Sequence, residues 1–293
     1  MEKKLQSKTA EEMAGFRAFE MLRPRKDRLC EDSFAVHFLT GPWVDRCKKP
    51  LRAKFYLWVV NLINPGAPDT VPIRVRFIDD HIREGVKQGV EQLIILGAGY
   101  DCRPYRMPEL ENGVQIFDVD HQSTQAHKRH ILSSVLDTLP GHVAFVPFQL
   151  EKEGVAQSLK DHGYDSNKRS LFILEGLIMY LDPQAVRSLF TFISGNSGSG
   201  SSVVFDFLPP GVVDGTIQNR GGRNMHQWAK RKGEPFKFGI DGHDLPGFLS
   251  GLGFHDIRVT TAGACRDQYA GGGLSRRKAS PLFSFATAYT GIA

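Results

Sequence analysis

Two hydrophobic patterns divide the chain. From Ser7 to about Asp80, apolar positions recur at helical spacing, as in "SKTAEEMAGFRAFEMLR", where a Ser or Thr precedes an acidic first turn. From Gln92 onward, short apolar runs alternate with polar, helix-like stretches. Strands that alternate with helices are typical of a mostly parallel sheet covered by helices on both faces.

Seven apolar runs are predicted to be strands. They are "QLIILG", "VQIFDVD", "HVAFVPF", "SLFILEG", "SVVFDFL", "DIRVTTA" and "LFSFATAYT". The last two are joined by "GACRDQYAGGGLSRRKASP", which is too polar and glycine-rich for a clear crossover helix, so we expect an antiparallel last strand. The predicted fold is therefore α/β, with a Rossmann-like, seven-stranded, mostly parallel sheet, an N-terminal helical segment and an inserted lid.

We expect one integrated domain with two parts. Residues 1–85 form an N-terminal helical cap, and residues 86–293 form the core that binds the ligand. The lid is the insertion of about 208–240 after the fifth strand, because a segment of this length usually covers or binds something. Within the cap, "AKFYLWVVNLIN" fits either a buried helix or a strand, and core packing is favoured for the run from Phe55 to Trp58.

Composition indicates a globular protein. The 293 residues are 41% hydrophobic, which is enough to build a large core. No apolar run approaches the roughly 18 residues of a membrane span, and the polar N-terminus differs from a signal peptide. We therefore expect a cytoplasmic protein without a membrane partner. The four cysteines and ten histidines show no metal-ligand spacing, so we expect reduced thiols and no metal site. The stretch Asp79-Asp80-His81 is predicted to be an exposed helical turn and not a metal site.

The net charge of +5 is concentrated near the N-terminus. Between Met21 and Lys54 stand nine basic and four acidic residues, and nine minus four equals the whole net charge. An anionic partner or substrate is one interpretation, and a solvated helical face is the other. The solvated face is favoured because no nucleic-acid-binding motif accompanies the charge, and no nucleic-acid partner is expected.

Candidate chemistry begins at the glycine turn after the first predicted strand. Gly97-Ala98-Gly99 lies where open α/β sheets bind their ligands. Cys102 stands where a dinucleotide-binding turn needs its third glycine or alanine. Because two glycines alone are weak evidence, the turn indicates a ligand without identifying it.

Carboxylates follow two further strands. "FDVD" ends in Asp118 and Asp120, about twenty residues past the glycines, where a carboxylate accepts hydrogen bonds from a ribose diol. NAD and S-adenosylmethionine both carry that diol, and the aspartates could also simply cap the next helix. Glu175 directly follows "LFIL". A carboxylate there favours the ammonium and sulfonium groups of S-adenosylmethionine and repels a pyrophosphate, so methyl transfer is favoured over hydride transfer.

These segments together resemble a known family. "QLIILGAGYDCRPYR", "FDVDHQ", "LFILEGLIMYL" and the upstream "IRVRFIDD" are similar to the leucine carboxyl methyltransferase family, from about Thr9 to Ala288. The resemblance implies an S-adenosylmethionine-dependent O-methyltransferase, with residues 86–293 as its cofactor-binding core.

The resemblance also implies which residues bind the cofactor. Arg74, with Arg76 as the alternative, would contact the carboxylate of the methionine moiety. The family's Asp-Leu pair near the adenine reads Gln149-Leu150 here. The whole implied cofactor set is Arg74, Gly97, Ala98, Gly99, Asp120, Gln149, Leu150 and Glu175.

The expected acceptor is a carboxylate or hydroxyl oxygen of a small molecule. A carboxylate needs only a positive or hydrogen-bonding group, and a hydroxyl also needs a general base within reach. Candidates for these roles are Tyr180, Arg74, Arg220, Arg223, His121, His226 and His243. The alternatives are carboxyl methylation of a protein or peptide C-terminus, an NAD(P)-dependent oxidoreductase and a non-catalytic cofactor-binding protein.

Overall fold

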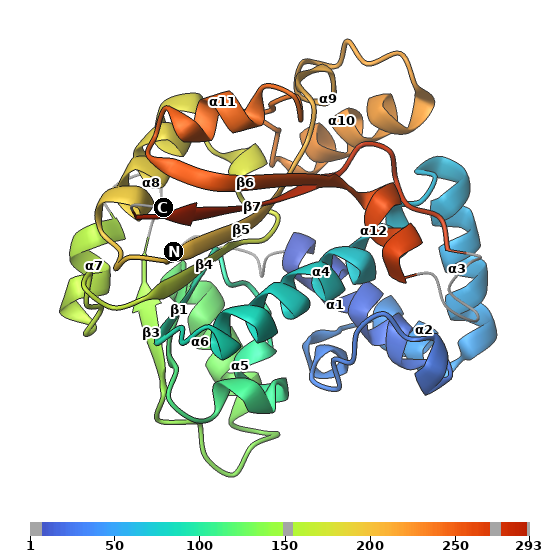
Figure 1. Cartoon of the computed structure of the whole chain (residues 1–293). Helices are drawn as coiled ribbons and strands as arrows, with labels where there is room; N and C mark the ends of the chain where they lie inside the picture. Colours follow the sequence, from blue (N-terminus) through green and yellow to red (C-terminus); the bar gives the residue numbers. More distant parts are fainter. Residues whose placement is uncertain (1–7, 149–154, 270–276, 292–293) are drawn as a thin grey trace.

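The computed structural model describes residues 8–148, 155–269 and 277–291 around a central sheet (Figure 1). The seven strands lie in the order β3-β2-β1-β4-β5-β7-β6. Strands β1 to β5 pair in parallel, and β7 runs antiparallel to both β5 and β6. All seven predicted strands and the antiparallel last strand are confirmed. The strands are β1 (Gln92–Leu96), β2 (Gln115–Asp120), β3 (Val143–Pro147), β4 (Ser170–Leu174), β5 (Ser202–Phe207), β6 (Phe254–Thr261) and β7 (Ser284–Thr290).

Helices surround the sheet and precede it. The α-helices are α1 (Lys8–Met21), α2 (Pro42–Lys48), α3 (Pro50–Ile63), α4 (Ala67–Lys87), α5 (Arg103–Arg106), α6 (Gln122–Leu132), α7 (Val155–Asp161), α8 (Pro183–Gly195), α9 (Pro210–Asp214), α10 (Arg220–Lys232), α11 (Leu245–Ser250) and α12 (Ala262–Tyr269). Short 3-10 helices are η1 (Arg25–Asp27), η2 (Ala35–Phe38), η3 (Pro108–Leu110) and η4 (Ile178–Tyr180). Helix α12 lies in the connection between β6 and β7, the segment judged too polar and glycine-rich for a clear crossover helix.

Alternation along the strands builds a separate core on each face of the sheet. Ile94 and Leu96 of β1 pack in one cluster with residues of α7, α8 and α11. Leu93 and Ile95 point to the other face, where Ile78 of α4 packs. Figure 1 shows α8 and α11 above the sheet and α4 below it. Because both faces are covered, β1, β4 and β5 are buried at every position, which explains why they are recognisable from sequence as short continuous apolar runs.

The segment of uncertain type in the N-terminal region is helix α3. Only part of its surface packs inward, with Ala53 buried. Phe55 and Trp58 are 66% and 57% exposed, so the predicted core packing is wrong for these two residues. Tyr56 between them does pack inward, with its ring centroid 6.0 Å from that of Phe19. The run is apolar around most of the helix, and such a pattern does not say which side meets the protein. No described helix has the length and apolar character needed to cross a bilayer.

The lid region contains two helices, α9 and α10. Asn219 caps α10 by accepting a hydrogen bond from the Gly222 amide, and Gly233 ends it in the left-handed conformation, at φ +76°. Two contacts join this region to α1. The Lys232 Nζ lies 2.5 Å from Glu12 Oε2, and the Thr9 hydroxyl donates to Glu234 over 2.6 Å. The segment predicted to be a lid therefore contacts the N-terminal helix.

A buried ion pair fixes α6 to β2. Lys128 Nζ lies 2.5 Å from Asp118 Oδ2, and both side chains are fully buried. We predict that Lys128→Met destabilises the protein by about 3–5 kcal/mol, because it leaves a buried carboxylate without its counterion. The double variant Lys128→Met/Asp118→Leu should regain most of this loss. Urea unfolding measures both, and the exposed Lys160→Met serves as the control, with an expected change within about 0.5 kcal/mol.

Candidate functional site

A cavity of about 710 Å³ lies at the carboxyl ends of the central strands. Its floor is formed by the ends of β1 and β4, which are neighbours although β2 and β3 come between them in the chain. The sheet order reverses at this point, and ligands of open α/β proteins bind at such reversals. Residues of α1, α3, α4 and the lid complete its walls.

The glycine turn forms one edge of the cavity and requires its glycines. Gly97 and Gly99 have φ values of +67° and +48°, in the region that side chains disfavour. A Cβ atom on Gly97 would also lie 3.0 Å from Leu177 Cδ1. The amides of Gly97 and Ala98 both donate to Val119 O, over 2.9 and 3.1 Å. The turn therefore crosses from β1 toward β2 with its backbone close to the cavity.

Only one of the two aspartates that end β2 lines the cavity. Asp120 Oδ2 accepts a hydrogen bond of 2.6 Å from the Gly99 amide, and Oδ1 accepts one of 2.6 Å from the His121 amide. Asp118 instead points into the core toward Lys128. The structure thus places the predicted ribose ligand Asp120 directly beside the glycine turn.

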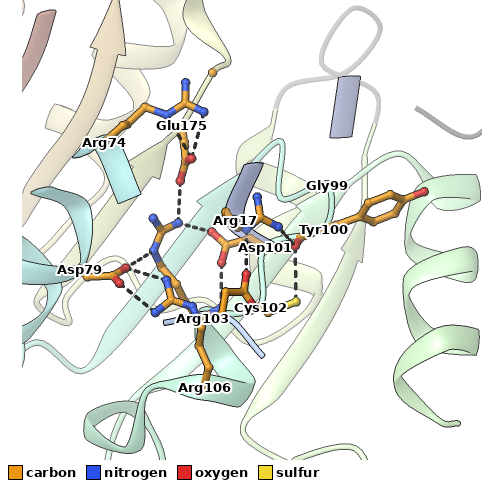
Figure 2. A network of polar contacts seen from close by, with 12 residues as sticks. Arg17, Arg74, Asp79, Gly99, Tyr100, Asp101, Cys102, Arg103, Arg106 and Glu175 are labelled. Carbon is orange, nitrogen blue, oxygen red and sulfur yellow. Dashed lines mark hydrogen bonds and ion pairs between the residues drawn. The ribbon is translucent and has the colours of Figure 1, made fainter. Parts of the chain in front are cut away.

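Glu175 lies between two buried arginines (Figure 2). Arg74 Nη2 is 3.0 Å from Glu175 Oε1, and Arg103 Nη1 is 2.7 Å from Oε2. Arg74 also donates from Nη1 to Asp206 Oδ2 over 2.7 Å. The same Asp206 accepts a 2.6 Å bond from the Gly176 amide, so β4, β5 and α4 meet at this carboxylate pair.

A further carboxylate, that of Asp79, pairs with Arg103 and with Arg106. Asp79 Oδ1 accepts a 2.7 Å bond from Arg103 Nε, and Arg106 donates two bonds of 2.8 and 2.9 Å to the same carboxylate. The prediction that Asp79 lies in an exposed turn is therefore wrong, since its side chain is buried. Its place on the inner stripe of α4 is tolerated because two guanidinium groups neutralise it. Asp80, the next residue, lies on the outer side and pairs with Arg76 over 2.8 Å.

Arg17 of α1 extends the network over the turn. Its Nε donates to Asp32 Oδ2 over 2.7 Å, and its Nη2 donates to Tyr100 O over 2.6 Å. Arg17 and Arg103 both line the cavity, and neither is in the predicted set. Arg103 follows the quoted "GAGYDC" at once, so its position was a usable signal. Arg17 stands among the apolar residues of "AGFRAF". This placement is the local sign in the sequence that the arginine is buried and therefore needs a partner.

Opposite charges hold the Glu175 carboxylate ionised. Burial by itself would raise the pKa of Glu175, but Arg103 and Arg74 outweigh it and lower the pKa from 4.5 to about 2. For Asp206 the balance is the opposite: burial outweighs the opposing effects of Arg74 and the Gly176 amide, and the pKa is raised. Glu175 is therefore a fixed negative charge on the cavity wall.

The charges around the cavity fit a cationic ligand. Its described lining carries six carboxylates and five cations, which leaves an excess of one negative charge; the carboxylates are Glu12, Asp32, Asp101, Asp120, Glu175 and Glu234, and the cations are Arg17, Arg74, Arg103, Arg106 and Lys237. S-adenosylmethionine carries two positive groups and one carboxylate, so it would reduce this excess. Arg103 Nη2 is buried and has no partner among the described residues. It is an available donor for a ligand carboxylate.

The remaining predicted residues divide between the cavity and the surface. Tyr180 and His121 line the cavity. Arg76, Arg220, Arg223, His226 and His243 are not among its described lining residues. The His226 ring nitrogen Nδ1 contacts Val212 O at 3.1 Å, and Arg223 binds the carbonyl oxygen of Gln218 on the exposed side of α10. Gln149 and Leu150 lie outside the described residues.

Comparison with known proteins decides the family. The model of the family described as leucine carboxyl methyltransferase matches residues 10–194. The chain belongs to this family. The match confirms the resemblance inferred from the sequence, and with it the family's cofactor, S-adenosylmethionine.

Two relatives agree with this assignment. A Bacillus subtilis protein, provisionally named the S-adenosyl-L-methionine-dependent methyltransferase YktD, is 32% identical over 185 residues. The match covers 63% of this chain and 59% of that protein, less than two thirds of its length. A Mycobacterium marinum protein with the same kind of provisional name is 29% identical over 210 residues, covering 70% of this chain and 67% of its own.

Solved structures confirm the fold. A protein from Thermobifida fusca YX, provisionally named a methyltransferase, has a TM-score of 0.61 at 11% identity and covers 96% of this chain and 94% of its own. A DUF574 family protein from Streptomyces avermitilis has a TM-score of 0.60 at 11% identity, covering 94% and 97%. At such low identity the likeness extends to the arrangement of strands and helices only.

The first site prediction concerns Asp120. We expect Asp120→Ala to weaken binding of S-adenosylhomocysteine about 10- to 100-fold, as for lost hydrogen bonds to one charged group. Isothermal titration calorimetry measures the affinity. The exposed Asp137→Ala should bind like the wild type. Unchanged affinity of Asp120→Ala would mean that another carboxylate holds the ribose.

The second site prediction is a pH dependence of stability. Because the folded pKa of Glu175 is lowered from 4.5 to about 2, its stabilising contribution is complete above about pH 4.5 and is lost as the pH falls toward about 2. Glu175→Gln removes this titration, so its melting temperature should fall less steeply with acidification than that of the wild type. Thermal unfolding across this range tests it, with the exposed Glu91→Gln as control. Parallel curves for wild type and Glu175→Gln would contradict the assignment.

Proposed function

We propose that the chain transfers the methyl group of S-adenosylmethionine to an oxygen of a small-molecule acceptor, and that a carboxylate is the favoured acceptor. The observation that carries the proposal is the single cavity that joins a charged compartment to an apolar one. The charged compartment contains the glycine turn, Asp120 and Glu175. The apolar compartment lies under the lid and is lined by Met179, Leu208, Met225, Trp228 and Phe236.

Bound S-adenosylmethionine would supply an electrophilic methyl carbon on a sulfonium. The acceptor oxygen forms a bond to this carbon as the carbon–sulfur bond breaks, and the bonding pair stays on sulfur. Such an in-line displacement depends mainly on alignment. The turn at Gly97 to Gly99, Asp120 and the Glu175–Arg103 pair would hold the cofactor at one end of the cavity. The lid would hold the acceptor at the other.

Tyr180 is one of the predicted acceptor contacts that line the cavity, together with Arg74 and His121. Burial raises the pKa of its hydroxyl well above the ordinary value of 10. A tyrosine of this kind stays protonated at neutral pH, so it donates a hydrogen bond and cannot take a proton. Such a donor suits an acceptor oxygen that is already ionised, and carboxylates are ionised at neutral pH. The base candidate His121 lies instead on the cofactor side, directly after Asp120, where it caps α6 and its Nδ1 contacts Ser123 Oγ at 2.8 Å.

The acidic side chains on the acceptor side support the same choice. Glu234 accepts a hydrogen bond from the Thr9 hydroxyl, and Glu12 pairs with Lys232. Both carboxylates are therefore engaged in contacts between α1 and the lid. For a hydroxyl acceptor, one of them, or His121 at the start of α6, would have to leave its partner and act as a base. A carboxylate acceptor needs no such change.

Two other functions remain as alternatives. Methylation of a protein or peptide C-terminus uses the same chemistry, but the contacts of Thr9 and Glu12 with the lid would have to break for a protein chain to enter between α1 and the lid. An NAD(P)-dependent oxidoreductase would bring a pyrophosphate to the wall that carries Glu175 and Asp101, where it would be repelled. Calorimetry separates the cofactors: we expect S-adenosylhomocysteine to bind and NADH not to bind.

The deciding experiment uses S-adenosylmethionine labelled in the methyl group. The protein is incubated with a cell extract, and labelled products are separated into small-molecule and protein fractions. We expect the label in small molecules and its release as volatile methanol under mild alkali, as for a methyl ester. An alkali-stable product would indicate a hydroxyl acceptor, and label in the protein fraction would favour the C-terminal alternative. No transfer, with NADH bound tightly, would overturn the proposal.

A further inference from the structure

Helix α3 carries an apolar stripe that faces away from the protein. Leu51, Phe55, Trp58 and Leu62 are 80%, 66%, 57% and 54% exposed, and Ile63 beside them is 47% exposed. Their spacing of four, three and four residues places the first four along one face of the helix. The Phe55 and Trp58 rings contact each other, with centroids 5.8 Å apart. Large apolar residues exposed together in this way usually mark an interaction surface.

Basic side chains surround this stripe. From Pro42 to Ile63 the chain has five basic residues and one acidic residue, and α3 itself contains no acid. At 3.6 residues per turn, Arg52 and Lys54 flank the stripe on its two sides. The single acid, Asp45, pairs with Arg52 and with Lys49, at 3.5 Å from the latter. Lys48 and Lys54 are exposed and have no ion pair with any described residue.

The opposite face of α3 belongs to the cavity. Val60, on the side of the helix roughly opposite the exposed stripe, and Asn64, which caps the C-terminus of α3, both line it. In Figure 1, α3 lies at the margin of the molecule, away from the sheet. One helix therefore separates the cavity from the apolar stripe outside.

We propose that the outer face of α3 binds the surface of an anionic lipid bilayer. Trp, Phe and Leu on one face with Lys and Arg beside them are the composition of helices that lie in the membrane interface. The apolar side chains enter the region between headgroups and acyl chains, and the lysines remain at the lipid phosphates. The proposal stands whether or not the proposed methyl transfer is correct.

A second copy of the chain is a poorer occupant of this face. Another α3 brings an apolar stripe but offers no acidic side chain to Lys48 and Lys54. An anionic bilayer satisfies both the stripe and the cations. No membrane partner was expected from the sequence because it contains no apolar run long enough to span a bilayer. A helix that lies on the membrane surface does not need such a run. The anionic partner that the charge pattern left open is thus assigned to lipid.

The test is sedimentation of the full chain with lipid vesicles. Vesicles of phosphatidylglycerol mixed with phosphatidylcholine should bind the protein, and vesicles of phosphatidylcholine alone should bind it much more weakly. Binding to the anionic vesicles should weaken as salt is added. Brominated lipids should quench tryptophan fluorescence, and Trp58→Phe should lose most of that quenching.

Matched variants separate the two contributions. Phe55→Ser/Trp58→Ser should abolish vesicle binding, whereas Val135→Ser, at a different exposed apolar site, should not change it. Lys48→Gln/Lys54→Gln should lower the partition coefficient roughly 25-fold, at about fivefold for each charge removed. The exposed Lys160→Gln and Lys230→Gln serve as charge controls. These side chains are on the surface, so circular dichroism should show all variants folded.

Three results would overturn the proposal. One is no binding to anionic vesicles at low salt. Another is binding that survives Phe55→Ser/Trp58→Ser unchanged. The third is a dimer in light scattering that becomes a monomer in the same double variant, which would assign the face to a second copy.

Discussion

The pairing of buried charge is the constraint on which the site depends. A carboxylate or guanidinium removed from water is costly unless an opposite charge and hydrogen bonds compensate it. Here Glu175 lies between Arg74 and Arg103, and Asp79 forms ion pairs with both Arg103 and Arg106. These residues come from α4, α5 and the end of β4, so no pair can form until these elements are in place. Packing of the helices and formation of the site are therefore one event.

The same constraint gives the cavity its character. Because the arginines are matched by carboxylates, they do not make the site basic, although the chain as a whole has a net charge of +5. The basic excess lies elsewhere, along α2 and α3. The protein thus keeps its positive surface apart from a cavity with a slight negative excess, and each can meet a ligand of opposite sign.

Sequence predicted what local pattern determines. Short apolar runs that alternate with helix-like stretches identified the strands. The positions of Gly97, Asp120 and Glu175 at strand ends then predicted that these residues lie close together. It could not find Asp79 as a counterion, because that role requires knowing that α5 packs over α4. It also misjudged α3, where most of the helix surface is apolar and only tertiary packing distinguishes the inside from the outside. Contacts between side chains from distant segments of the chain are therefore what the local hydrophobic pattern cannot predict.

Helix α1 contacts both halves of the cavity. Arg17 holds it to Tyr100 beside the glycine turn, and Glu12 holds it to Lys232 at the end of α10. Because one helix makes both contacts, displacement of α1 would expose the cofactor end and the lid end of the cavity in a single event.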